Sequence, residues 1–265
     1  MSTGEMSAET GWGHGSGRGE GLVIESLYPE FSNQGGDNGN MMYLRACLPE
    51  AEVVETRFGE APAFATRGDV SLVYAGYMTE RQQRLAAGAL VPYADALRSH
   101  VARGGMGLFT GNAAELLGRF VVTDAGERFD CLGLFDFAAR QDFSSRQPQV
   151  FMGAFDAGEP ARDPLAIVGY RIGFTEIEGD GATEPFCRVT VGPGLNAGSA
   201  FEGYRRDGLI ATWLCGPLLP LNPLFTGWIL RRLGVDAPVA FERQAMAAYE
   251  KRVEEFKTPG IKMPI

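Results

Sequence analysis

The residues best suited to chemistry lie in segment 104–118, with the sequence GGMGLFTGNAAELLG. An apolar run ends at Thr110, Gly111 follows, and a stretch with helical spacing comes next. This order is typical of a nucleophile elbow, in which a tight turn lifts one side chain above the edge of a sheet and the first amides of a helix point at the same spot. We therefore expect Thr110 to stand exposed at the tip of such a turn.

A threonine hydroxyl attacks only when a neighbouring base accepts its proton. The chain has two histidines, His14 and His100. His14 lies in a glycine-rich stretch that we expect to be disordered, and His100 lies late in a helical stretch where we expect a surface position. Neither is predicted to serve Thr110, so any catalysis must rely on other groups.

Four cysteines are spread widely along the chain without a Cys-x-x-Cys pair. Such spacing predicts neither a zinc site nor a disulfide framework. We interpret all four as free, buried or half-buried thiols. They are Cys47, Cys131, Cys187 and Cys215.

The elements that would position Thr110 alternate between strands and helices over the first 120 residues. A continuous apolar run at 70–75 is typical of a buried parallel strand. A helix is predicted to start at Thr79 and to be kinked or split at Pro92. Further strands are expected at 21–28, 53–57 and 107–109, and a helix capped by Asn38 or Asn40 after the first of them. The pattern predicts an α/β fold with a three-layer, open, mostly parallel sheet flanked by helices.

The second half of the chain is richer in glycine and in short apolar runs. We predict strands at 120–123, 131–135, 150–154, 167–172 and 209–214, a loop at 195–203, and two C-terminal helices, at 224–233 and 240–256. We expect a disordered leader at 1–20, a single domain at 21–258 and a short tail at 259–265. Trp228 and Ile229 are interpreted as core residues, although the 218–233 segment also offers apolar side chains to a partner.

The charge and composition of the chain exclude several classes of function. The formal net charge is -9, and 45% of the residues are hydrophobic. Phosphate contacts require clustered Lys and Arg, so we expect no binding to nucleic acid or to an anionic membrane surface. No apolar run is long enough to span a bilayer, and we expect a cytoplasmic protein. No phosphate-binding G-x-x-x-x-G-K-[ST] motif occurs, and no cofactor or metal is predicted.

Five segments in this order resemble the class I glutamine amidotransferases. The resemblance is strongest to the cobyric acid synthase-like branch, and within it to the glutaminase subunits of lipid II isoglutaminyl synthases. It covers about residues 22–235. The segments are DNGN at 37–40, YAGYMTERQ at 74–82, the elbow, LGLFDF at 132–137 and WLCGPLLPLNP at 213–223.

The resemblance implies a flavodoxin-like amidotransferase fold, glutamine as a ligand and a partner that resembles the Mur ligases. It also implies roles for individual residues. The cysteine nucleophile of the family falls on Thr110, and its histidine base falls on Cys215. Oxyanion amides fall on Gly76, Tyr77 and Gly111, and Arg146 falls near the position that holds the glutamine carboxylate.

Both reacting groups of the family are therefore replaced here, while their surroundings are kept. The leading hypothesis is a subunit that has lost glutaminase activity and acts as a partner or regulator of a Mur-ligase-like, cell-wall amidating enzyme. One alternative is an active amidotransferase with rearranged groups, in which Cys215 attacks or Glu115 activates Thr110 through water. Another is a module that binds an amino acid in a pocket lined by Tyr77, Thr110 and Cys215. A generic α/β hydrolase with Thr110 as nucleophile also lacks the histidine that it needs.

Overall fold

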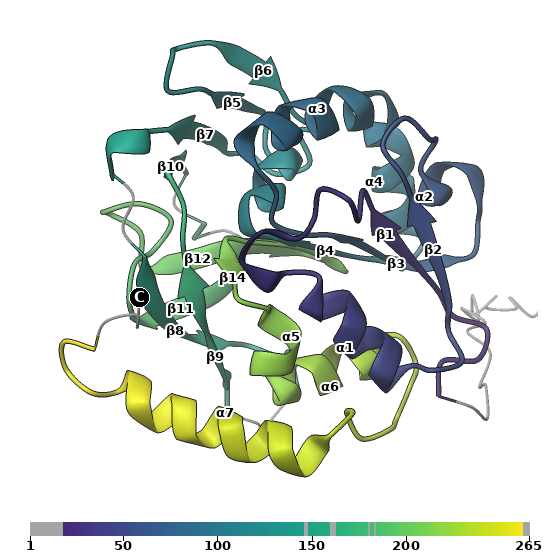
Figure 1. The fold of residues 1–265 in the computed structure, drawn as a ribbon, viewed down its shortest axis with the longest axis vertical. Helices are drawn as coiled ribbons and strands as arrows, with labels where there is room; N and C mark the ends of the chain where they lie inside the picture. The colour runs from purple at the N-terminus through teal and green to yellow at the C-terminus, as the bar shows by residue number, and fades with distance from the viewer. Residues whose placement is uncertain (1–17, 146–147, 160–162, 180, 183, 262–265) are drawn as a thin grey trace, which may run out of the picture.

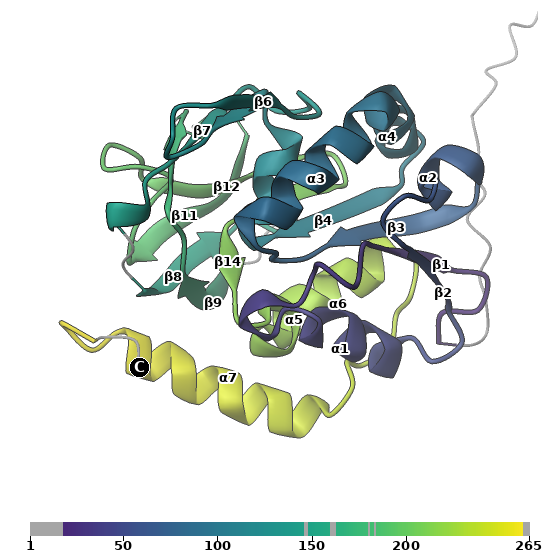
Figure 2. The same cartoon turned by 45° about the horizontal axis from the view of Figure 1, so that its top comes forward.

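The computed structural model describes residues 18–145, 148–159, 163–179, 181–182 and 184–261. In this part of the chain a long sheet forms the middle layer, and helices cover both of its faces (Figures 1 and 2). The α/β class and the helix-flanked sheet agree with the prediction. The predicted leader lies almost wholly outside the described residues, and the single domain at 21–258 stays a prediction.

One half of the long sheet is parallel. Its strands run in the order β13-β4-β3-β1-β2, and every neighbouring pair among them is parallel. The strands are β1 (Val23–Leu27), β2 (Glu52–Thr56), β3 (Val70–Ala75), β4 (Met106–Thr110) and β13 (Leu209–Thr212). All residues of β1, β3, β4 and β13 are buried, because helices cover both faces of these strands.

The other half of the same sheet is antiparallel, in the order β14-β9-β8-β11-β12, with β12 pairing to β13. Its strands are β8 (Gln149–Phe155), β9 (Leu165–Arg171), β11 (Pro185–Val191), β12 (Phe201–Arg206) and β14 (Leu214–Cys215). The mostly parallel sheet predicted from the first 120 residues is thus extended by hairpins from the second half of the chain. The predicted loop at 195–203 is wrong at its end, since residues 201–203 belong to β12.

Helices from different parts of the chain cover the two faces (Figure 2). One face carries α2 (Ala63–Thr66), α3 (Glu80–Leu90) and α4 (Ala94–Ala102). The other carries α1 (Gly39–Cys47), α5 (Leu218–Leu221), α6 (Pro223–Arg232) and α7 (Glu242–Phe256). The capping box between Thr79 and Gln82 starts α3 as predicted, and a 3-10 turn containing Pro92 separates α3 from α4. Among the described residues, none of the helices has the length and apolar character needed to cross a bilayer.

A second, smaller sheet lies beside α3 (Figure 1). Its order is β10-β7-β5-β6, with β5 (Phe120–Val122), β6 (Arg128–Asp130), β7 (Ala138–Gln141) and β10 (Thr175–Glu178). The strand predicted at 131–135 is wrong. The amides of Leu132 and Leu134 instead donate to the carbonyls of Leu116 and Leu117 at 2.9 Å, so they satisfy the end of the preceding 3-10 helix rather than a sheet.

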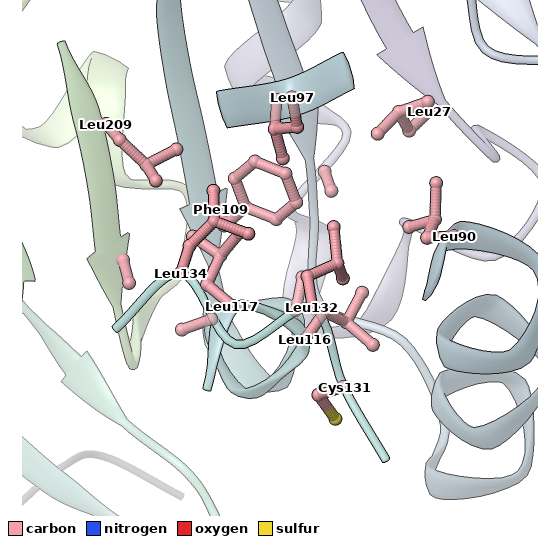
Figure 3. Close-up of a cluster of buried hydrophobic side chains, with 14 of the residues drawn as sticks. Leu27, Leu90, Leu97, Phe109, Leu116, Leu117, Cys131, Leu132, Leu134 and Leu209 are labelled. Atoms are coloured by element: carbon pink, nitrogen blue, oxygen red, sulfur yellow. The ribbon is translucent and has the colours of Figure 1, made fainter. Parts of the chain in front are cut away.

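The hydrophobic core is divided by the sheet. On the α3 and α4 side, Phe109 of β4 lies among leucines of α3, α4 and the segment after β4 (Figure 3). On the other side, Trp228 and Ile229 of α6 are buried with the aromatic rings of β8 and β11. Their interpretation as core residues is therefore confirmed.

Candidate functional site

Thr110 is the last residue of β4 and precedes the 3-10 helix Gly111–Leu117. Its backbone is extended, with φ -112° and ψ 155°, and the turn takes its positive φ of 59° at Gly111 instead. The side chain is fully buried, so the exposed tip expected from the sequence is not formed. Thr110 lies at the start of a helix, but it points into the protein.

The Thr110 hydroxyl donates a short hydrogen bond to Oδ2 of Asp37. The same oxygen accepts the Tyr77 amide at 2.8 Å, and Oδ1 of Asp37 accepts Nδ2 of Asn40 at 3.1 Å. Burial raises the pKa of Asp37, while the hydrogen bonds from Thr110, Tyr77, Tyr74 and Asn40 act in the opposite direction. The carboxyl group of Asp37 is therefore the centre of the site.

Tyr74 of β3 also belongs to the hydrogen-bond network around Asp37. Its hydroxyl donates to the backbone carbonyl of Asp37 at 2.9 Å, accepts Nδ2 of Asn40 at 3.0 Å and lies 3.3 Å from Oγ1 of Thr110. Burial raises the pKa of Tyr74 well above its usual value, so the hydroxyl keeps its proton. Oδ1 of Asn40 accepts the Leu219 amide at 2.8 Å, which ties the network to α5.

The predicted helix cap in this loop is not formed as expected. Asn38 is the residue before α1, but its side chain makes no capping hydrogen bond. Asn40 uses its side chain for the Asp37 network rather than for the helix end. The polar loop is therefore part of the site, because the buried side-chain amide of Asn40 and the buried carboxyl group of Asp37 form a hydrogen bond with each other.

The residues expected to form an oxyanion hole are Gly76, Tyr77 and Gly111. The amide of Tyr77 is already occupied by Asp37. A Cβ at Gly76 would lie 2.6 Å from the Tyr74 hydroxyl, and a Cβ at Gly111 would lie 2.6 Å from Cβ of Tyr77. Close packing therefore explains both glycines, whether or not their amides ever bind an oxyanion.

Cys215 ends the short strand β14 and is fully buried. Its thiol donates to the carbonyl of Tyr170 at 3.3 Å. Burial, together with the negative charge of Asp37, raises the pKa of Cys215 to about 12. The residue on which the resemblance places the family's histidine base is thus a protonated thiol.

Glu115 does not contact Thr110. It accepts Nε2 of Gln83 at 2.6 Å and Nε1 of Trp213 at 3.2 Å, and burial raises its pKa. The carboxylate beside Thr110 belongs to Asp37. The sequence contains Asp37 in the DNGN segment, but nothing in that segment shows that it reaches a residue 73 positions away.

The space beside this network is very small. A cavity of about 10 Å³ is lined by Tyr77, Gly111, Glu115 and Arg171 with their neighbours. This volume is near the minimum for one water molecule and does not admit an amino acid. The Tyr77 hydroxyl donates to the carbonyl of Ile172 at 2.8 Å, so its ring spans this space. Thr110 and Cys215 therefore do not line an amino-acid pocket in this conformation.

Three further predictions concern residues outside this network. Arg146 and His14 lie outside the described residues. His100 is buried rather than on the surface, because its ring packs over Gly105 and its Nε2 lies 3.0 Å from the carbonyl of Met106. Burial lowers its pKa. Met106 and Thr110 are at opposite ends of β4, roughly 13 Å apart at the rise of a strand, so His100 cannot serve as a base for Thr110.

The four cysteines are free and buried, as predicted. Among the residues that the structure describes, no cluster of three or more His, Cys, Asp or Glu side chains could hold a metal ion.

No family model matches the chain. The sequence is similar to the subunit GatD of lipid II isoglutaminyl synthase (glutamine-hydrolyzing) from Staphylococcus aureus (strain N315). The two are 25% identical over 225 residues, which cover 83% of this chain and 88% of that protein. This chain has a glutamine amidotransferase-like domain.

Two solved structures resemble the amidotransferase-like domain more weakly. One is a glutamine amidotransferase with a TM-score of 0.46 and 14% identity, covering 80% of this chain and 99% of the other. The second is a glutamine amidotransferase from Thermotoga maritima with a TM-score of 0.44 and 9% identity, covering 90% and 94% of the two chains.

Proposed function

We propose that this chain is a glutamine amidotransferase-like subunit that does not hydrolyse glutamine. The observation that carries this proposal is the position of the Asp37 carboxylate. One of its oxygens accepts both the hydroxyl at the nucleophile position, Thr110, and the amide at the oxyanion position, Tyr77. The chain's own carboxylate thus occupies the place where the oxygen of a reacting amide would bind.

The chemistry of the replaced residues supports the same conclusion. A threonine hydroxyl is a far weaker nucleophile than a thiolate, and Cys215 supplies neither a thiolate nor a base. Removing one member of a nucleophile and base pair typically lowers the rate by about 10⁴ to 10⁶. Both members are replaced here, and the adjacent cavity is too small for glutamine.

A second candidate is an amidotransferase with rearranged groups, in which Asp37 rather than Glu115 accepts the proton of Thr110. The hydrogen bond between them favours this candidate, since a base must be in contact with its nucleophile. It further requires Tyr77 to leave the cavity and Asp37 to release the Tyr77 amide. Asp37→Asn separates the two candidates, because it removes the base but keeps a hydrogen-bond acceptor.

We further propose that the subunit acts as a partner or regulator of a Mur-ligase-like, cell-wall amidating enzyme in the cytoplasm. The support for this role is that the GatD relative is one subunit of a synthase. Any nucleotide would then be bound by the ligase subunit. Four free thiols are consistent with a reducing compartment.

Co-expression with the Mur-ligase-like protein of the same genome tests this role. We expect the two chains to co-purify, and we expect the ligase to be more stable or more active with supplied ammonia when the subunit is present. Thr110→Ala and Cys215→Ala should leave the complex intact, since neither side chain is exposed. A ligase that neither binds the subunit nor changes its activity would contradict the proposal.

A further inference from the structure

Arg171 is the last residue of β9. Its guanidinium donates to the backbone carbonyls of Gly194 and Leu195, the latter at 3.2 Å. Within the described ranges it forms no ion pair. A guanidinium has five N–H donors, so two carbonyls leave part of its capacity for another acceptor.

The side chain of Arg171 is partly buried. Burial lowers its pKa, and the acidic groups that oppose this shift are Glu202 and Glu115. Both of these carboxyl groups already have partners: Glu202 accepts the Thr212 hydroxyl and the Trp213 amide at 2.8 Å, and Glu115 is held by Gln83 and Trp213. A charged group in such a place is stabilised when an anion binds it directly.

Arg171 also borders an open cavity of about 550 Å³, which we call the Arg171 cavity. This volume is within the range typical of small-molecule sites. Its lining includes Thr175 and Glu176 of β10, Asp142 and the glycine-rich loop 192–199. Neither Thr110 nor Cys215 is part of the lining.

The glycine-rich loop is fixed in place by side-chain hydrogen bonds. Nδ2 of Asn196 donates to the carbonyls of Ile177 at 2.8 Å and Gly179 at 2.7 Å. A Cβ at Gly194 would lie 2.0 Å from the carbonyl oxygen of Ser199, so the loop folds tightly on itself. The cavity wall is therefore formed before any ligand binds, which reduces the entropy lost on binding.

We propose that the Arg171 cavity binds the amino and carboxylate groups of a free amino acid. The planar guanidinium matches a carboxylate through two parallel hydrogen bonds. The exposed carboxylate of Glu176 in the lining suits an ammonium group and disfavours a phosphate. Arg171 also borders the small cavity beside Tyr77, but neither Thr110 nor Cys215 lines the Arg171 cavity, and the proposal does not depend on the proposed loss of glutaminase activity.

Ligand-observed NMR on the full chain tests the site, with each of the twenty amino acids as probes. Glutarate and inorganic phosphate serve as probes that lack the ammonium group. We expect saturable binding of at least one amino acid, with glutarate and phosphate at least about tenfold weaker. Absence of amino-acid binding, or equally tight binding of glutarate or phosphate, would overturn the proposal.

Two arginine substitutions then test whether the amino acid binds at Arg171. Arg171→Gln should weaken binding at least about tenfold, because a charged hydrogen bond is lost. Arg140→Gln, an exposed arginine of β7 paired with Glu178, should leave binding unchanged. Unaltered affinity in a folded Arg171→Gln protein would contradict the assignment.

Amide chemical shifts of the wild-type chain show where the amino acid binds without the need for a variant. The signals of Gly192 and Gly194, which line the Arg171 cavity, should move on saturation, and that of Gly111, which lines the small cavity beside Tyr77, should not. Movement confined to Gly111 would place the ligand beside Tyr77 and would also contradict the proposal. None of these outcomes depends on ammonia release or on the ligase partner.

Discussion

Thr110 and Asp37 are joined by a hydrogen bond in which the threonine hydroxyl is the donor. The two residues come from different elements, the end of β4 and the loop before α1. The same Asp37 oxygen also accepts the Tyr77 amide. A carboxylate of the chain therefore binds both residues on which the resemblance places the nucleophile and an oxyanion amide.

The thiol of Cys215 should be unreactive in the folded protein. Its pKa is raised from 9.0 to about 12, so at pH 8 its thiolate fraction is about a thousandfold lower than that of an ordinary cysteine. Alkylation with iodoacetamide followed by peptide mass spectrometry should leave Cys215 unmodified in native buffer and fully modified in urea. Rapid native modification would support the alternative in which Cys215 is the nucleophile.

Replacing Gly111 by Ala should destabilise the protein by about 2 to 4 kcal/mol. The new methyl group would combine the strain of a positive φ with a clash against Tyr77. Gly126→Ala is the matched control, because Gly126 also has a positive φ, 82°, but has open space around its Cβ position. We expect the control to lose about 1 to 2 kcal/mol in urea unfolding.

The difference between these two glycine variants measures the Tyr77 contact. In the double variant with Tyr77→Gly, which removes the Cβ of residue 77 together with its ring, the additional loss at Gly111 should largely disappear, as expected for two residues in contact. Equal losses at Gly111 and Gly126 would show that Tyr77 does not pack over the turn after β4.

Glu202 should make the folded state less stable as the pH rises towards neutrality. Burial raises its pKa from 4.5 to about 7, so folding favours the protonated carboxyl group. This stabilisation is fully present below pH 4.5 and is lost as the pH rises through about 7. The shift corresponds to at most roughly 3 kcal/mol in the free energy of unfolding.

Urea unfolding between pH 5 and 8 checks this prediction. Glu202→Gln should reduce the decline in stability with pH, because the amide does not titrate. Glu50→Gln, at an exposed position, should follow the wild-type curve. A wild-type stability that rises with pH, together with an unchanged slope in Glu202→Gln, would contradict the assignment.

The sequence predicted those parts of the fold that depend on interactions between residues close together in the chain. The helix start at Thr79, the break at Pro92 and the apolar strand Val70–Ala75 all depend on residues close together in the chain. The segment 131–135 has the apolar composition of a strand, but its amides bind the carbonyls of Leu116 and Leu117. Such a long-range choice of partner cannot be predicted from composition.

The site shows the same division between local and long-range information. The position of Thr110 at the end of a strand follows from its own segment and is observed. Its burial and its bond to Asp37 depend on how the polar loop 33–40 folds over the sheet, and the sequence gives no register for that contact. The resemblance pointed to Thr110 and Tyr77, but not to the Asp37 carboxylate that accepts hydrogen bonds from both.

Ammonia release from glutamine tests the central claim most directly. The purified chain should release no more ammonia than Thr110→Ala, Asp37→Asn or Cys215→Ala, both alone and with the Mur-ligase-like protein. An enzyme-coupled assay for free ammonia gives the rate. Sustained turnover by the wild type that Thr110→Ala or Asp37→Asn abolishes would contradict the account.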